Sequence, residues 1–227
     1  MYTLVIGNKN YSSWSLRPWI LLHEAGVPFE ERMVPFHDEA GWAHLRATMP
    51  PGKVPMLLDG ERRVWDSFAI VEYLAERHAG VWPADADARA WGRCAAAEMH
   101  SGFGVLRSRC SMNIGIRVRL HAVPPDLERD VARIDSLWSE GLARFGGPFL
   151  AGAAFTAVDA FFAPVVFRIQ TYGLAVGASS AAYVGRMLER PAMKRWYAEG
   201  VAETWRDLPH DADCRAAGEW TSDVRAV

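Results

Sequence analysis

The chain has 227 residues, of which 50% are hydrophobic and 23% charged, and its formal net charge at pH 7 is -2. This composition is typical of globular proteins and excludes a disordered or fibrous chain. The nearly balanced charge predicts no basic stripe for nucleic acid, so we expect a small-molecule or protein partner. The length suits one large domain or two small ones.

The cysteine and histidine content argues against several classes of site. Cys94, Cys110 and Cys214 are odd in number and far apart, which suggests neither a disulfide framework nor a Cys-x-x-Cys pair and favours a reducing, cytoplasmic location. The seven histidines show no metal-ligand spacing, so no metal is expected. The start resembles no signal peptide and no apolar run could span a bilayer, so we expect no membrane association.

The first third of the sequence alternates strand and helix signals. Apolar periodicity and turn residues such as Asp59-Gly60 define the individual elements. In chain order we expect a strand at 3–6, a helix containing Leu16, Trp19, Ile20 and His23, a strand at 29–34, a helix at 39–47, a hairpin of 56–58 with 62–65, and a helix at 67–78.

The pattern changes from Gly80 onward, where no convincing strand follows. We therefore expect a first domain at residues 1–80, a linker at 81–87 and an all-helical domain at 88–227.

Two apolar stripes and one cap define the helices of this second part. The stripe from Trp91 to Leu106 predicts one long helix, and the stripe from Leu127 to Phe145 predicts another. Thr156 and Asp159 have the spacing of a capping box, which predicts the start of a buried helix.

A serine-rich segment joins the first strand to the first helix. Residues 10–17 read Asn-Tyr-Ser-Ser-Trp-Ser-Leu-Arg, which places the hydroxyls of Ser12, Ser13 and Ser15 where backbone amides and the positive helix end converge on an anion. Taken alone, serines at this place are as well explained as helix caps.

Two further short segments carry polar groups suited to a peptide ligand. Val54-Pro55 precedes a strand, and a cis bond there would expose the Val54 amide and carbonyl to an extended peptide. Asp66-Ser67 opens the next helix and offers a carboxylate, a hydroxyl and free amides to an amino-acid-like group. Each feature has an ordinary structural explanation as a turn or a cap.

The order of these features resembles the glutathione S-transferase family over nearly the whole chain. Residues 12–17 resemble the serine motif of the zeta class, with Trp14 where that motif carries cysteine. Residues 52–55 resemble the family's cis-proline loop, Asp66-Ser67 its acidic residue and serine for the γ-glutamyl group, and residues 155–159 its folding capping box.

The resemblance implies a fold, a co-substrate and an assembly. The fold is an α+β thioredoxin-like N-terminal domain followed by an all-α C-terminal helical bundle, the co-substrate is glutathione, and the protein is a homodimer. In this family the catalytic hydroxyl holds glutathione as its thiolate: the zeta alignment indicates Ser12, which we take first, and the spacing to Arg17 indicates Ser13. The implied glutathione-binding residues are Ser15, Lys53 for the glycine carboxylate, Val54 and Pro55 for backbone pairing, and Asp66 and Ser67 for the γ-glutamyl end.

A hydroxyl is sufficient for this chemistry. A free thiol has a pKa of about 8.5, and lowering it by about two units requires roughly 2.7 kcal/mol. A hydrogen bond to a charged group supplies roughly 1.5–3 kcal/mol, and a helix N-terminus adds roughly 0.3–1 kcal/mol. No general base is needed.

The electrophile pocket is expected between the domains, lined by the first loop and the long helix after the linker. The candidate lining residues are Tyr11, Trp14, Arg107, Arg109, Met112, Asn113 and Arg117, with the arginines available to a carboxylate-bearing substrate. Cys110 is expected to be a small buried residue, and His100 a packing or hydrogen-bonding group.

Two classes of function follow. One is an enzyme that conjugates or isomerises a small electrophile through a serine-stabilised glutathione thiolate. The other is a glutathione-binding or protein-interaction module that keeps the fold without catalysis, because a fold does not fix a function.

Overall fold

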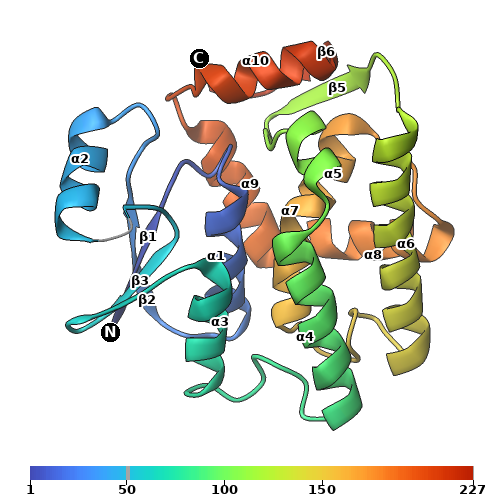
Figure 1. The fold of residues 1–227 in the computed structure, drawn as a ribbon, viewed down its shortest axis with the longest axis horizontal. Helices are drawn as coiled ribbons and strands as arrows, with labels where there is room; N and C mark the ends of the chain where they lie inside the picture. Colours follow the sequence, from blue (N-terminus) through green and yellow to red (C-terminus); the bar gives the residue numbers. More distant parts are fainter. Residues whose placement is uncertain (50–51, 227) are drawn as a thin grey trace.

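A four-stranded mixed sheet forms the N-terminal domain of the computed structural model, which describes residues 1–49 and 52–226 (Figure 1). The strands run in the order β2-β1-β3-β4. Their bounds are β1 Tyr2–Ile6, β2 Phe29–Met33, β3 Met56–Asp59 and β4 Arg62–Val64. β1 pairs parallel with β2 and antiparallel with β3, so the buried residues of β1 stand at the centre of the sheet.

Three helices accompany this sheet: α1 Ser13–Glu24, α2 Glu39–Thr48 and α3 Ser67–Ala75. α1 carries eight buried residues in succession from Ser15 to Leu22, because it lies against α3 on one side and α7 and α9 of the helical domain on the other. Pro50 and Pro51, in the segment expected to precede the cis-proline loop, lie outside the described residues.

The C-terminal domain is mainly helical (Figure 1). Its helices are α4 Ala86–Ser101, α5 Gly104–Arg109, α6 Pro125–Phe145, α7 Ala157–Tyr172, α8 Ala178–Leu188, α9 Pro191–Ala202 and α10 Leu208–Ala217. One hydrophobic core runs from the sheet through α1 into α7, so both domains share an apolar interior. The expected fold class is therefore confirmed.

The expectation that no strand follows Gly80 is wrong. β5 Ile116–Leu120 and β6 Gly218–Asp223 form an antiparallel pair in the helical domain. The two strands are about one hundred residues apart in the chain, so neither has a neighbouring strand in the sequence to reveal it.

The expectation of a single long helix from Trp91 to Leu106 is also wrong. α4 ends at Ser101 with Gly102 as its C-cap, and Phe103 adopts a left-handed backbone conformation with φ 55°. α5 then starts with the Leu106 amide donating to the Asp130 carboxylate of α6 at 2.9 Å. The apolar stripe continues across this break because both helices face the same core.

The capping box at the start of α7 is present as predicted. The Asp159 carboxylate accepts from the Thr156 amide at 2.9 Å, and the Thr156 hydroxyl accepts from the third residue of the helix. The same carboxylate accepts from the Leu150 amide and the Tyr183 hydroxyl, each at 3.0 Å. α7 is buried along most of its length, as expected for the central helix of the domain.

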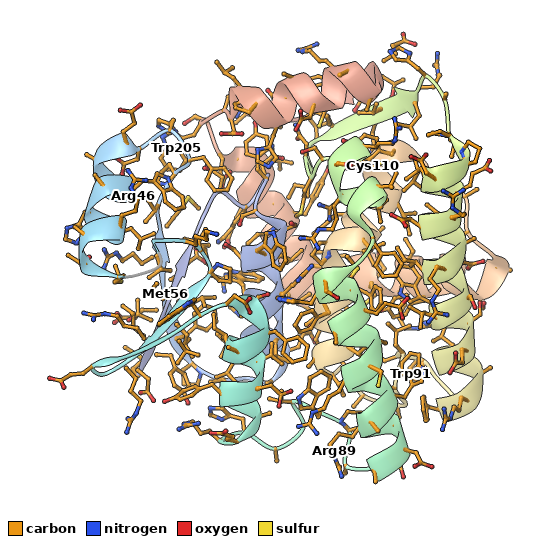
Figure 2. The ribbon with its side chains drawn as sticks, viewed as in Figure 1. Arg46, Met56, Arg89, Trp91, Cys110 and Trp205 are labelled. Atoms are coloured by element: carbon orange, nitrogen blue, oxygen red, sulfur yellow. The ribbon has the colours of Figure 1, made fainter. Side chains whose placement is uncertain are left out.

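The chain after α9 returns to the N-terminal domain. Trp205, between α9 and α10, lies beside His37 near α2 (Figure 2). α10 lies above the boundary between the two domains (Figure 1). The C-terminal segment therefore covers one end of the interdomain region, where the site described below is found.

Candidate functional site

The loop before α1 is held in place by the far end of the chain. The Glu203 carboxylate accepts from the amides of Lys9 at 2.6 Å and Asn10 at 3.3 Å, and from the Asn8 side chain at 3.3 Å. Trp196 donates to the Lys9 carbonyl at 2.9 Å. Burial raises the pKa of Glu203, and these donors oppose that shift. The serine loop therefore has a defined shape before any ligand binds.

The three serines of this loop differ in what their hydroxyls already do. Ser12 is the N-cap of α1, and its hydroxyl donates to that of Ser15 at 2.7 Å. Ser15 is fully buried and also accepts from the Gly7 amide at 3.2 Å. Ser13 is half-buried, and its hydroxyl has no hydrogen-bond partner within residues 1–49 and 52–226. Ser13 therefore has the uncommitted hydroxyl, and Ser15 connects α1 to the end of β1.

A cavity of about 300 Å³ lies beside this loop on the N-terminal domain. It is lined by Trp14, Lys53, Val54, Pro55, Trp65 and Asp66. The Val54–Pro55 bond is cis, as the resemblance implied. The amide and carbonyl of Val54 form no hydrogen bond with any described residue, which leaves both groups available to a ligand.

The start of α3 forms the end of this cavity. Asp66 caps the helix by accepting from the Phe68 amide at 2.9 Å and lies 3.3 Å from Nε2 of His100. The Ser67 hydroxyl is buried and has no partner in the described part of the chain. Ser67 does not itself line the cavity, and the Ser180 hydroxyl of α8 is likewise buried without a partner in the described residues, so Ser67 is placed next to the cavity only by its neighbour Asp66.

A second cavity of about 380 Å³ lies on the other side of the serine loop. Residues expected from the sequence that line it are Tyr11, Ser12, Ser13, Trp14, Lys53, Val54, Arg107 and Met112. It also includes Phe36, Trp42, Ser111, Arg168 and His210, which the sequence reasoning missed. Trp14, Lys53 and Val54 line both cavities, so the two are neighbours with a common wall.

Five expected site residues do not line either cavity: Ser15, Ser67, Arg109, Asn113 and Arg117. The side chains of all but Ser67 are committed elsewhere. Arg109 is paired with Asp126 at 3.5 Å. Asn113 is buried and bonds to Asn10 and Asp211, each at 2.9 Å. Arg117 donates to the carbonyls of Ile114 and Ile116.

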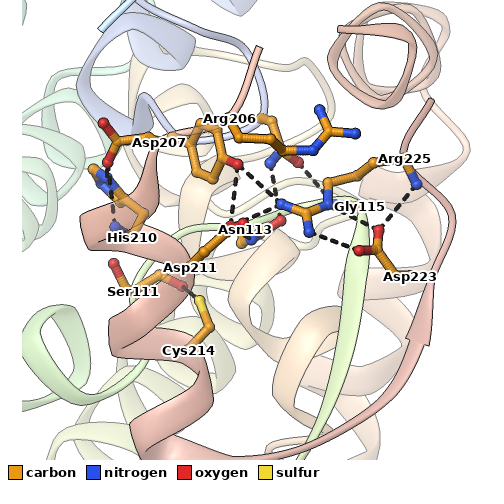
Figure 3. Close-up of polar contacts among 12 residues, drawn as sticks. Ser111, Asn113, Gly115, Arg206, Asp207, His210, Asp211, Cys214, Asp223 and Arg225 are labelled. Carbon is orange, nitrogen blue, oxygen red and sulfur yellow. Dashed lines mark hydrogen bonds and ion pairs between the residues drawn. The ribbon is translucent and has the colours of Figure 1, made fainter. Parts of the chain in front are cut away.

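Tyr11 lines the larger cavity, but its hydroxyl bonds to Asp211 and Arg225, which belong to a polar network at the C-terminal end (Figure 3). It donates to Asp211 at 3.1 Å and accepts from Arg225 at 2.9 Å. Burial raises the pKa of Tyr11 to about 12. The network fastens α10 over the cavity, and it leaves Tyr11 a poor candidate for activating a thiol.

The sequence signals for the missed residues differ. Arg168 is the single charged residue on the buried part of α7 after Asp159. Because burying a charge is costly, a lone arginine in such an apolar segment indicates a functional or structural role. His210 bonds to Asp207 and stacks on Phe36, but nothing in the local sequence places it near residue 12. Cys110 is buried as expected, with burial raising its thiol pKa to about 12.

The described residues hold no group of three or more His, Cys, Asp or Glu side chains arranged for a metal ion. Over the same residues, every helix is too short or too polar to cross a lipid bilayer.

Comparisons with known proteins agree with the fold. The model of the glutathione S-transferase N-terminal domain matches residues 11–77, and that of the C-terminal domain matches residues 118–199. A zeta-class glutathione S-transferase of Euphorbia esula is 30% identical over 161 residues, which cover 68% of this chain and 71% of the relative.

Solved structures show the same architecture. A theta-class glutathione S-transferase from Xanthomonas axonopodis pv. citri with glutathione bound has a TM-score of 0.63 and 25% identity, covering 86% of this chain and 96% of its own. A glutathione transferase homolog from Burkholderia gl BGR1 with bound glutathione has a TM-score of 0.66 and 23% identity, covering 88% and 97%. The architecture is a thioredoxin-like domain joined to a helical domain. The chain belongs to the glutathione S-transferase family.

Proposed function

We propose that the protein transfers glutathione to a small electrophile and that a serine at the start of α1 holds the glutathione thiolate. The observation that carries this proposal is the uncommitted hydroxyl of Ser13, which lines the larger of two adjoining cavities next to Trp14 of their common wall. A tripeptide in the smaller cavity would present its sulfur to this wall, and an electrophile in the larger cavity would face the sulfur from the other side.

The smaller cavity offers a partner for each part of glutathione. Val54 supplies an unpaired amide and carbonyl for the cysteinyl backbone. Asp66 in this cavity supplies a carboxylate for the γ-glutamyl ammonium group, and Lys53 supplies a cation for the glycine carboxylate. We assign the γ-glutamyl carboxylate to the adjacent Ser67, whose hydroxyl has no partner among the described residues. Glutathione bound to the two solved structures compared above supports this choice of ligand.

The chemical step follows from the charges. The bound thiol loses its proton to solvent, the sulfur forms a bond to the electrophilic carbon, and the leaving group departs with the electron pair of the bond that breaks. A hydrogen bond from a hydroxyl to the thiolate is worth roughly 1.5–3 kcal/mol, which lowers the thiol pKa by about one to two units.

We assign the donor to Ser13 in preference to Ser12. The Ser12 hydroxyl hydrogen is used in the bond to Ser15, whereas Ser13 need give up no existing bond. Identity of 30% to a zeta-class relative favours a related chemistry, so isomerisation through a transient glutathione adduct is the finer form of the proposal. The family resemblance also leads us to propose a homodimer.

The test is to titrate the protein with glutathione while recording the ultraviolet absorbance of the thiolate, and to measure kcat/KM with an activated aryl chloride. We expect Ser13→Ala to raise the pKa of the bound thiol by about one to two units and to lower kcat/KM by about 10- to 100-fold. Ser108→Ala, at an exposed helix serine bonded only to the Val105 carbonyl, is the matched control.

The outcomes separate the alternatives. A larger effect in Ser12→Ala than in Ser13→Ala would move the donor by one residue. If glutathione binds but its thiol keeps the pKa that it has in free solution, the protein is a glutathione-binding module and not an enzyme.

A further inference from the structure

Three guanidinium groups lie near the boundary of the two domains. Arg107 of α5 and Arg168 of α7 line the larger cavity, and Arg17 of α1 shares the Trp14 ring with Arg107. Arg17 is 1% exposed and Arg168 4% exposed, whereas Arg107 is half-buried. Burial lowers the pKa of each, and the charge of Arg107 adds to the lowering for Arg17 and Arg168. The cluster is therefore costly to keep charged without an anion.

The arginine cluster has no carboxylate of its own. Within the described chain, none of the three guanidinium groups lies within 4.0 Å of an Asp or Glu oxygen, the limit for an ion pair. Arg168 donates through Nε to the Cys110 carbonyl at 2.8 Å, and Arg107 donates to the His100 carbonyl at 3.0 Å. These bonds leave further guanidinium N–H groups of both residues without a partner among the described residues.

Other buried cations of the protein are treated differently. Lys9 is 3% exposed and pairs with Glu31 and Glu199. Arg225 is 9% exposed and pairs with Asp211 and Asp223. Buried charges are normally paired, and Lys9 and Arg225 follow this rule. Arg107 and Arg168 at the cavity have no carboxylate partner among the described residues.

The geometry of the cluster suits a planar anion. Two of the groups contact the Trp14 ring, with Arg17 at 4.3 Å and Arg107 at 4.4 Å from its centroid, which limits their freedom. Arg107 and Arg168 both line the cavity that also contains Ser13. A guanidinium group binds a carboxylate through two parallel hydrogen bonds, and a partly dry site strengthens them.

We propose that Arg107 and Arg168 bind a carboxylate carried by the electrophile, so that the second substrate of this protein is an organic acid. This inference rests on the proposed glutathione transfer. The same chemistry has a second source in the carboxylates of glutathione. The arrangement favours the electrophile, because Arg107 and Arg168 line only the larger cavity, whereas Pro55 and Asp66 line only the smaller one.

The experiment compares two probes that differ only in charge. One is a chlorodinitrobenzoate whose chloride is flanked by nitro groups, and the other is the corresponding benzamide. In both, the thiolate sulfur bonds to the ring carbon and chloride leaves with the electron pair. We expect the wild type to prefer the benzoate in kcat/KM.

Two variants then test the arginines. We expect Arg107→Met and Arg168→Met each to reduce the benzoate-to-benzamide ratio of kcat/KM by about 10- to 100-fold, the loss of a hydrogen-bonded charge. Arg109→Met, at an exposed arginine paired with Asp126 outside the cavity, is the matched control and should leave the ratio unchanged. Arg168→Lys, which keeps the charge but loses the planar fork, should give an intermediate ratio.

A binding measurement covers the case in which a variant at the buried Arg168 does not fold. Chloride-free dinitrobenzoate should bind the glutathione-loaded wild type more tightly than dinitrobenzamide, and Arg107→Met should remove that difference. Equal binding of the two, or equal loss of both activities in the variants, overturns the inference. Weaker glutathione affinity in the arginine variants also overturns it, by assigning the cluster to the tripeptide. Absence of turnover with both probes contradicts the proposed transfer itself.

Discussion

Helices α1 and α7 both begin at a hydroxyl side chain. In the described part of the chain, they differ in whether a hydroxyl group near the helix start remains without a hydrogen-bond partner. At α7, Thr156 and Asp159 satisfy each other, and Asp159 also accepts from Leu150 and Tyr183, so the helix start is closed within the core. At α1, Ser12 and Ser15 satisfy each other, while Ser13 keeps a free hydroxyl beside a cavity.

This difference separates a structural helix start from one suited to a ligand. Both have a hydroxyl residue at the N-cap, Thr156 in α7 and Ser12 in α1. The two helix starts differ in which hydroxyl groups have hydrogen-bond partners. A hydroxyl without a partner can donate to an anion when it lies at a cavity, whereas in the core it destabilises the fold. The following predictions test whether the two helix starts divide their roles in this way.

The largest expected effect is on stability at α7. Asp159→Ala removes the acceptor for two buried amides and a buried hydroxyl, each costing about 1–3 kcal/mol when left unsatisfied. We expect the free energy of unfolding to fall by about 4 kcal/mol, measured by urea denaturation at neutral pH. Asp85→Ala, at the exposed N-cap of α4, is the control and should cost about 1 kcal/mol. If Asp159→Ala and Asp85→Ala lowered the free energy of unfolding equally, the buried hydrogen bonds at the start of α7 would stabilise the protein no more than an ordinary N-cap.

The next effect is a pH dependence of the same carboxyl. Burial raises the pKa of Asp159 to about 6. In the unfolded chain the value is about 3.9, so the folded state binds the proton more tightly. Protonation of Asp159 therefore adds about 3 kcal/mol of stability below about pH 4, and this increment is lost as the pH rises through about 6, which leaves the hydrogen bonds of the preceding prediction. The measurement is the unfolding free energy of the wild type minus that of Asp159→Asn across this range, and a flat difference would contradict the assignment.

The smallest effect is expected at the structural serine of α1. Ser15→Ala removes the acceptor for the Gly7 amide and for the Ser12 hydroxyl, and we expect a loss of about 1 kcal/mol in stability. Because the Ser15 side chain faces neither cavity, glutathione affinity measured by tryptophan fluorescence should change by less than about twofold, well under the tenfold that 1.4 kcal/mol represents. A tenfold loss of affinity would return Ser15 to the binding site.

Much of the fold could be predicted from the sequence because its signals are local. The capping box of α7, the hairpin at Asp59-Gly60 and the order of elements in the first domain all depend on residues a few positions apart. The serine loop and the Val54–Pro55 segment could be named for the same reason.

The remainder depends on residues that only folding brings together. Residues 116–120 alternate Ile-Arg-Val-Arg-Leu, but the strand that pairs with them starts at Gly218. The choice among Ser12, Ser13 and Ser15 depends on which hydroxyl another serine already uses. Arg168 reaches the cavity from a helix about 150 residues after the serine loop, so no spacing in the sequence connects it to Ser13.

The hydrogen bonds between Glu203 and the loop before α1 have a consequence for the synthesis of the protein. Glu203 is separated by 194 and 193 residues from the two amides it holds. A ribosome completes the sheet and α1 long before it adds this carboxylate. The nascent chain thus carries all three serines without the contact that shapes them, and the site acquires its final form only when α9 and the residues after it have been synthesised and docked.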